Sequence, residues 1–108
     1  MSTVVKHLLC EDLPAMLAAS PCLLLDCRNL TDYRNSHMDG AMHAHDGLVE
    51  NLVRKGDKQQ TILVYCYSGH RSEHLTEFLT GFGFDNVFNL VGGYTRWQEL
   101  QCCLPESS

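Results

Sequence analysis

The chain has 108 residues, which suits one domain and leaves no room for a second independent core. Thirteen acidic and eight basic residues give a formal net charge of −5, and the basic residues are scattered, so neither a nucleic acid nor an anionic membrane surface is an expected partner. No apolar stretch approaches the ~20 residues of a membrane span and no signal peptide is visible, so a cytoplasmic location is expected.

The first half of the chain predicts short strands and helices separated by turn residues. Val4–Leu9 is expected to form an edge strand, and Glu11–Ala19 a helix whose acidic first turn suits the helix dipole. Cys22–Asp26 is a continuous apolar run, which is typical of a strand that is covered on both faces. Three further elements are expected: a helix at Thr31–Ser36 capped by Thr31, a short strand at Ala41–His43, and a helix at Gly47–Lys55 ended by Gly56.

The second half of the chain continues the same alternation. Thr61–Tyr65 is a second strand of the buried type, and it leads through a polar loop into a helix at Ser72–Thr80 with Gly81 as its C-cap. Along that helix, one face is shared by Leu75, Phe78 and Leu79. The pattern ends with a strand at Asn86–Leu90, a tight turn at Gly92-Gly93 and a helix at Tyr94–Gln101.

Strands that alternate with helices in a short chain predict an α/β fold, with a mostly parallel central sheet and helices on both faces. We expect a single domain over residues 1–108, with a core from about residue 6 to residue 100 and a loose tail at 104–108. Six cysteines fall below the ~8–10% of a disulfide scaffold, so free thiols are expected, with Cys22 and Cys27 buried. No zinc-ligand spacing is present, and no metal or other cofactor is expected.

Cys66 stands at the carboxyl end of a buried strand, where ligand-binding residues are found in open α/β sheets. A six-residue loop runs from Cys66 to Arg71, and Ser72 opens the next helix. Backbone N–H groups in such a loop form a positive concavity that lowers a thiol pKa, and Arg71 adds a fixed positive charge. A purely structural role as one more buried thiol fits less well, because the loop is polar. The sequence therefore predicts a reactive thiolate suited to a small anion.

Four stretches of the sequence, in order, carry a resemblance to a known family. They are Leu23-Leu24-Leu25-Asp26-Cys27-Arg28 with Asp32-Tyr33, then His37-Met38-Asp39-Gly40-Ala41, then Cys66-Tyr67-Ser68-Gly69-His70-Arg71-Ser72, and finally Val87, Leu90, Gly92-Gly93 and Trp97. From about Lys6 to Leu100 the chain resembles a single-domain rhodanese of the thiosulfate sulfurtransferase family. Two positions depart from the family pattern: Ser36 stands where a glycine usually precedes the histidine, and Met38 stands for the usual isoleucine.

The resemblance implies a rhodanese-like fold and a sulfurtransferase reaction. Cys66 would accept a sulfane sulfur from thiosulfate or a related donor as a persulfide, and would pass it to a thiophilic acceptor such as cyanide or a thiol, thioredoxin among them. The implied substrate-binding residues are those whose backbone amides would cradle the sulfur: Tyr67, Ser68, Gly69, His70 and Arg71. His70 is expected either to help hold an anionic donor or to be a solvated loop residue.

Asp26, Arg28 and His37 are expected to support the site rather than to react. Asp26 and Arg28 are two residues apart at a strand end, so their side chains point to the same side and an ion pair is expected. His37 is expected to be a buried hydrogen-bonding residue, because a preformed thiolate can displace sulfite from a sulfane donor without a dedicated acid–base pair.

Two other functions are considered. Cysteine-dependent phosphatases and arsenate reductases of related design have a loop one residue longer than the four residues that separate Cys66 from Arg71. The shorter loop favours a single sulfur atom over a tetrahedral phosphate or arsenate. The other alternative is a non-catalytic rhodanese-like binding module, a class that commonly lacks the cysteine that this chain keeps.

Overall fold

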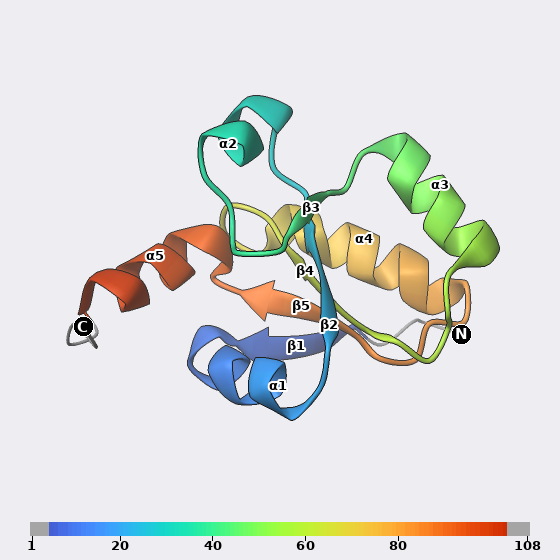
Figure 1. Ribbon diagram of the computed structural model, residues 1–108, viewed down its shortest axis with the longest axis horizontal. Coiled ribbons are helices and arrows are strands. Elements are labelled where there is room, and N and C mark those ends of the chain that lie inside the picture. Colours follow the sequence, from blue (N-terminus) through green and yellow to red (C-terminus); the bar gives the residue numbers. More distant parts are fainter. Residues whose placement is uncertain (1–4, 104–108) are drawn as a thin grey trace.

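Within residues 5–103, which the computed structural model describes, five strands form one sheet through the middle of the molecule (Figure 1). The strands are β1 (Lys6–Leu9), β2 (Cys22–Asp26), β3 (Met42–His43), β4 (Thr61–Tyr65) and β5 (Val87–Val91). Their order across the sheet is β1-β5-β4-β2-β3, and every neighbouring pair is parallel. The predicted parallel sheet of an α/β fold is confirmed.

Helices cover both faces of this sheet, as predicted (Figure 1). One face carries the 3-10 turn η1 (Cys10–Asp12), α1 (Leu13–Ala19) and α5 (Gly93–Cys103), and the other carries α3 (Asp46–Lys55) and α4 (His70–Gly81). The short helix α2 (Leu30–Asn35) follows β2 beyond its carboxyl end. No helix in the described part of the chain is long and apolar enough to cross a membrane.

The core has two layers because side chains alternate along each strand. On β4, Leu63 and Tyr65 face the layer of α1 and α5, whereas Ile62 and Val64 face the layer of α3 and α4. All four are fully buried, which explains the continuous apolar run in the sequence. Burial of such a side chain is worth about 1.5–3 kcal/mol, so this central strand anchors both layers.

Several element ends differ from the predicted ones. The helix after β2 begins at Leu30 with Asn29 as its N-cap, so the predicted cap at Thr31 is wrong. Asn29 has the extended backbone of an N-cap residue, so the helix starts directly after it, at Leu30. The helix predicted from Glu11 begins at Leu13 after η1, and β5 begins one residue later than expected. The expected strand start at Val4 and the expected tail at 104–108 lie outside the described residues.

The end of α4 is set by a glycine two residues beyond the predicted one. Gly83, with a φ of 99°, is the left-handed residue, and the predicted cap at Gly81 is wrong. The Phe84 amide donates to the Leu79 carbonyl at 3.2 Å, as in a Schellman motif. Both Phe84 and Leu79 are fully buried, and their packing fixes where the chain turns. Of the side chains expected to share one face of this helix, Leu79 is fully buried whereas Phe78 is 47% exposed.

Candidate active site

β2 and β4 are neighbours, and the loops that follow them begin at the same level of the sheet (Figure 1). Asp26 pairs with Tyr65 in the strand register, and the Cys27 amide donates to the Tyr65 carbonyl at 2.8 Å. Cys66 therefore opens its loop beside the loop that carries Arg28. This meeting of two loops at the carboxyl edge of a parallel sheet is where open α/β folds place their ligands.

The Cys66 thiol is buried and surrounded by hydrogen-bond donors. Its Sγ accepts from Gly69 N at 3.2 Å, from Ser72 N at 3.3 Å and from Ser72 Oγ at 3.3 Å. Burial raises the pKa of this thiol, but the bonds from Ser72 Oγ and from the amides of Ser72, Gly69 and Ser68 outweigh it, so the pKa of Cys66 lies below its ordinary value. These donors favour the thiolate, which is the nucleophilic form.

The helix that follows the cysteine begins inside the predicted loop, at His70 rather than at Ser72. Its N-cap is Gly69, whose φ of 103° lies in the left-handed region that favours glycine. This turn directs the amides of Gly69 and Ser72 toward the same sulfur atom. The positive end of a 12-residue helix lies at the same place and adds to the field on a thiolate.

Ser72 and Asn89 complete the cradle, and neither is predicted from the sequence as a site residue. Ser72 Oγ lies 2.5 Å from Oδ1 of Asn89, a buried residue of β5. Asn89 Nδ2 donates to the Gly69 carbonyl at 3.1 Å and lies 3.3 Å from Nδ1 of His7. The signal in the sequence is a single polar residue inside the otherwise apolar run Val87–Val91.

The start of α5 holds the loop from the other side. The amides of Tyr94 and Thr95 donate to the carbonyls of Cys66 and Tyr67, at 2.8 and 3.1 Å. Gly93 makes this approach possible: a Cβ there would lie 2.6 Å from the Cys66 carbonyl oxygen. Its φ of 57° is also left-handed. The predicted glycine turn is confirmed, and its contact with the Cys66 loop explains why glycine is needed.

Tyr67 ties the loop to α2. Its hydroxyl donates to the Asp32 carboxylate and accepts from the Asn29 amide at 3.3 Å. Ser68 and His70 are exposed at the rim of the loop. The Asp32-Tyr33 motif of the sequence thus contributes the Asp32 carboxylate, which accepts from Tyr67 and so positions the residue next to Cys66.

Arg71 lies at the rim of the loop, where it is exposed. Its Nη1 is 3.5 Å from Oδ1 of Asn29, so the guanidinium bridges the two loops. The lowered pKa of Cys66 comes from hydrogen bonds, whereas the Arg71 charge acts on Cys27. Burial raises the pKa of Cys27 to about 12, and the nearby Arg71 charge offsets this only in part. Cys27 and Cys22 are free and half-buried, less buried than predicted, because both lie at strand ends.

The predicted ion pair between Asp26 and Arg28 is present and buried. Arg28 Nη2 lies 2.8 Å from Asp26 Oδ2, and Arg28 Nε lies 3.1 Å from Asp26 Oδ1. Arg28 also donates to the Ser36 carbonyl at 2.5 Å, and its guanidinium lies 4.0 Å from the centre of the Tyr94 ring. The pair therefore links β2 to α2 and α5 beneath the site. Arg28 contacts only the carbonyl of Ser36, but the Ser36 hydroxyl, which the family glycine lacks, accepts from the Tyr94 hydroxyl at 3.3 Å.

His37 is exposed, so the prediction that it is buried is wrong. Its Nδ1 lies 2.7 Å from the Tyr33 carbonyl oxygen, and its ring stacks on the Tyr33 ring at 4.0 Å. Tyr33 in turn donates its hydroxyl to the Ala41 carbonyl at 2.8 Å. Because α2 buries none of its residues, a histidine that stacks on this helix stays exposed as well. His37 is a hydrogen-bonding residue, as predicted, and it supports the connection from α2 to β3.

Comparisons with known proteins bear on the family and the fold of this chain. Residues 9–100 match the family described as the rhodanese-like domain. The thiosulfate sulfurtransferase GlpE of Shewanella oneidensis is 31% identical over 94 residues, which cover 87% of this chain and 93% of that protein. The rhodanese-like domain of the Alr3790 protein from Anabaena sp. has a TM-score of 0.77 at 24% identity, covering 90% of this chain and 76% of that chain. A rhodanese-like domain protein from Staphylococcus aureus has a TM-score of 0.74 at 25% identity, covering 86% and 91%.

Proposed function

The chain belongs to the rhodanese-like domain family, and we propose that it is a sulfurtransferase in which Cys66 carries a sulfane sulfur from thiosulfate or a related donor to a thiophilic acceptor. The observation that carries the proposal is the set of donors on the Cys66 sulfur: the amides of Gly69 and Ser72 and the Ser72 hydroxyl, all within 3.3 Å. Hydrogen bonds to an ionised acceptor are about twice as strong as neutral ones, so this arrangement stabilises a thiolate.

In the first half-reaction, the Cys66 thiolate attacks the outer sulfur of thiosulfate. A bond forms between Sγ and that sulfur, the S–S bond of thiosulfate breaks, and its electron pair leaves with sulfite. Cys66 becomes a persulfide anion. Arg71 at the rim of the loop is suited to attract the dianionic donor and to hold the departing sulfite, because it is always charged and presents several donors.

In the second half-reaction, a nucleophilic acceptor attacks the outer sulfur of the persulfide. The Sγ–S bond breaks and its electron pair returns to Cys66, which regenerates the thiolate. Cyanide would leave as thiocyanate, and a thiol, in a small molecule or in a protein such as thioredoxin, would leave as a hydropersulfide. This ping-pong order needs no metal and no proton transfer by a separate side chain.

The test is intact mass spectrometry after incubation with thiosulfate. Wild type is expected to gain the mass of one sulfur atom and to lose it on addition of cyanide, as thiocyanate appears. Cys66→Ser is expected to do neither, whereas Cys22→Ser, which changes a half-buried thiol at the far end of β2, should do both. Turnover that survives in Cys66→Ser would contradict the assignment of the nucleophile.

An assay with a phosphate ester as substrate distinguishes a sulfurtransferase from a phosphatase. The loop of six residues from Cys66 to Arg71 offers its amides to one sulfur atom, whereas a phosphoryl group has three peripheral oxygens that need donors during transfer. Little or no hydrolysis of p-nitrophenyl phosphate is expected. Efficient hydrolysis without a detectable persulfide would make the protein a phosphatase. If the folded protein shows neither sulfur transfer nor phosphate-ester hydrolysis, the non-catalytic binding module is favoured.

A further inference from the structure

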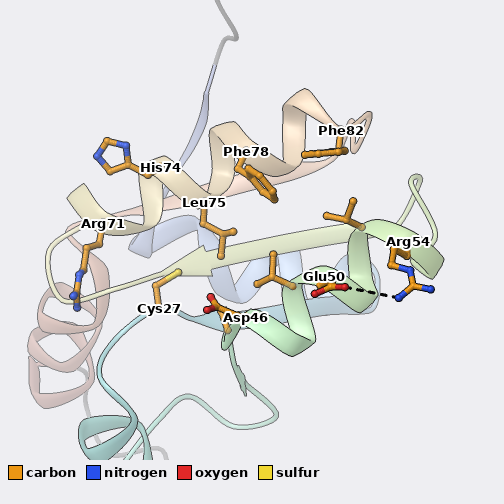
Figure 2. Close-up of a pocket in the computed structure, with 12 residues that line it drawn as sticks. Cys27, Asp46, Glu50, Arg54, Arg71, His74, Leu75, Phe78 and Phe82 are labelled. Atoms are coloured by element: carbon orange, nitrogen blue, oxygen red, sulfur yellow. Dashed lines mark ion pairs between the residues drawn. The ribbon is translucent and has the colours of Figure 1, made fainter.

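A groove of about 600 Å³ lies between α3 and α4, on the face of the sheet that carries both helices (Figure 2). Pockets of roughly 300–1,000 Å³ with mainly apolar walls are typical of small-molecule sites. The apolar part of the wall consists of Ala44, Val49, Val53, Leu75, Phe78 and Phe82. The charged and ionisable groups that line it are Asp46, Glu50, Arg54, Arg71 and His74.

Two residues connect this groove with the Cys66 loop. Arg71 closes the loop and also lines the groove, and Cys27 lines the groove as well (Figure 2). Cys27 and Cys66 directly follow Asp26 and Tyr65, which are paired across the neighbouring strands β2 and β4. Neighbouring strands lie about 4.8 Å apart. The two cysteines also share a face of the sheet, because the residues two positions earlier, Leu25 and Val64, both pack toward α3 and α4. The groove therefore begins where the nucleophile's loop ends.

Two aromatic rings of α4 remain exposed along the groove. Phe78 and Phe82 are 47% and 50% exposed, and their ring centroids are 4.9 Å apart. Figure 2 shows Phe78 reaching from α4 toward α3. Exposed rings on the wall of a groove favour a ligand that removes apolar surface from water.

The charges around the groove narrow the choice of ligand. Glu50 and Arg54 are 3.8 Å apart and offset each other, and Asp46 keeps the α3 side acidic. An anionic body is therefore disfavoured, and an uncharged apolar one fits. Arg71 is the positive group at the loop end, where it would attract the thiolate form of a sulfur nucleophile.

We propose that the groove binds the apolar body of a small thiol, whose sulfur takes the sulfane sulfur from Cys66. The inference rests on the sulfurtransferase activity proposed above and adds the class of its acceptor. The acceptor thiolate attacks the outer sulfur of the persulfide, a bond forms between these two sulfurs, and the Sγ–S bond breaks. Its electron pair returns to Cys66, and the acceptor leaves as a hydropersulfide.

The test uses mercaptoalkanols with two, four and six carbons as acceptors for the wild-type protein and thiosulfate. Excess thiol converts the hydropersulfide into a disulfide and hydrogen sulfide, which is measured. Because each buried methylene adds favourable transfer energy, kcat/KM is expected to rise about threefold to fourfold per methylene. Phe78→Ser and Phe82→Ser should flatten this dependence. Leu17→Ser, an exposed apolar residue on α1 across the sheet, is the matched control and should keep it.

The results distinguish a failure of the sulfurtransferase proposal from a failure of the groove proposal. If wild type forms no persulfide with thiosulfate, the sulfurtransferase proposal fails. If the persulfide forms but thiols of all lengths react alike, or Phe78→Ser keeps the full dependence on length, the groove proposal alone is overturned. A Phe78→Ser protein that loses reaction with thioredoxin while keeping its selectivity among small thiols would make the groove a protein-docking surface and overturn the assignment to a small thiol.

Discussion

The hydroxyl oxygen of Ser72 lies 2.5 Å from Oδ1 of Asn89, and the same oxygen lies 3.3 Å from Sγ of Cys66. A hydroxyl has one hydrogen, so Ser72 can donate to only one of these acceptors at a time. Asn89 keeps Nδ2 toward the Gly69 carbonyl, which leaves Oδ1 facing Ser72. Asn89 Oδ1 and Cys66 Sγ therefore compete for the single hydrogen of the Ser72 hydroxyl, and the contact with Asn89 is the shorter one.

Ser72→Ala is expected to slow alkylation of Cys66 by iodoacetamide near neutral pH by roughly tenfold, because a hydrogen bond to a charged group is worth about 1.5–3 kcal/mol. Loss of the hydroxyl raises the pKa of Cys66 and reduces its thiolate fraction. Thr80→Ala, which removes a hydroxyl bonded to the Thr76 carbonyl later in α4, is the matched control and should leave the rate unchanged. An unchanged rate in Ser72→Ala would show that the amides alone stabilise the thiolate.

Asn89→Ala is expected to lower the free energy of unfolding by about 1–3 kcal/mol, because the buried Gly69 carbonyl loses its donor. It should also slow alkylation of Cys66, since Gly69 donates to that sulfur. Because Asn89 competes with Cys66 for the Ser72 hydrogen, Asn89→Ala leaves that hydrogen to Sγ, and the Ser72→Ala/Asn89→Ala double variant, which lacks it, should be slower than the product of the two single effects predicts. Independent, multiplying effects on the alkylation rate would contradict this coupling.

Asp26→Ala is expected to lower the free energy of unfolding by about 3–5 kcal/mol, because it leaves the buried Arg28 guanidinium without its carboxylate. Glu50→Ala breaks an exposed ion pair with Arg54 and should change the free energy of unfolding by less than about 1 kcal/mol. Urea denaturation of both variants provides the measurement. Equal effects would mean that the Asp26–Arg28 pair contributes no more than a surface contact.

Gly93→Ala is expected to destabilise the protein more than Gly40→Ala does. Both glycines have a left-handed φ, which costs an alanine about 1–2 kcal/mol. A Cβ at Gly93 would also lie 2.6 Å from the Cys66 carbonyl oxygen, whereas a Cβ at Gly40 meets nothing within 4 Å. Gly93→Ala should therefore displace the loop and reduce persulfide formation in the fraction that still folds. Equal loss of thermal stability in the two variants would contradict the proposed contact.

The sequence predicts those parts of the fold and site whose signal is local. Cys22–Asp26 and Thr61–Tyr65 are apolar runs between polar turns, and the structure has both strands with these bounds. The Asp26–Arg28 pair is also local, since the two side chains share one side of a strand end. Cys66 stands at a strand end followed by a polar loop, which is why it stands out among six cysteines.

The rest depends on contacts between distant segments. Ser72 and Asn89 are 17 residues apart and meet only because β5 pairs with β4. Tyr67 and the Asp32 carboxylate are 35 residues apart. Gly81 and Gly83 are equally good local stop signals for α4, and the burial of Phe84 decides between them. Such choices are made by packing, which the local pattern does not contain.

The pH dependence of thiol reactivity should separate Cys66 from Cys27. The thiolate is the reactive form, so the rate of Cys66 alkylation should fall as the pH drops through its lowered pKa, and the midpoint of this pH profile should lie below that of an ordinary cysteine. Burial raises the pKa of Cys27 to about 12, so Cys27 should stay protonated and slow throughout this range. Peptide mapping after brief iodoacetamide treatment at a series of pH values measures both rates. A Cys66 midpoint equal to or above that of an ordinary cysteine thiol would contradict the lowered pKa and, with it, the preformed thiolate on which the sulfur-transfer mechanism depends.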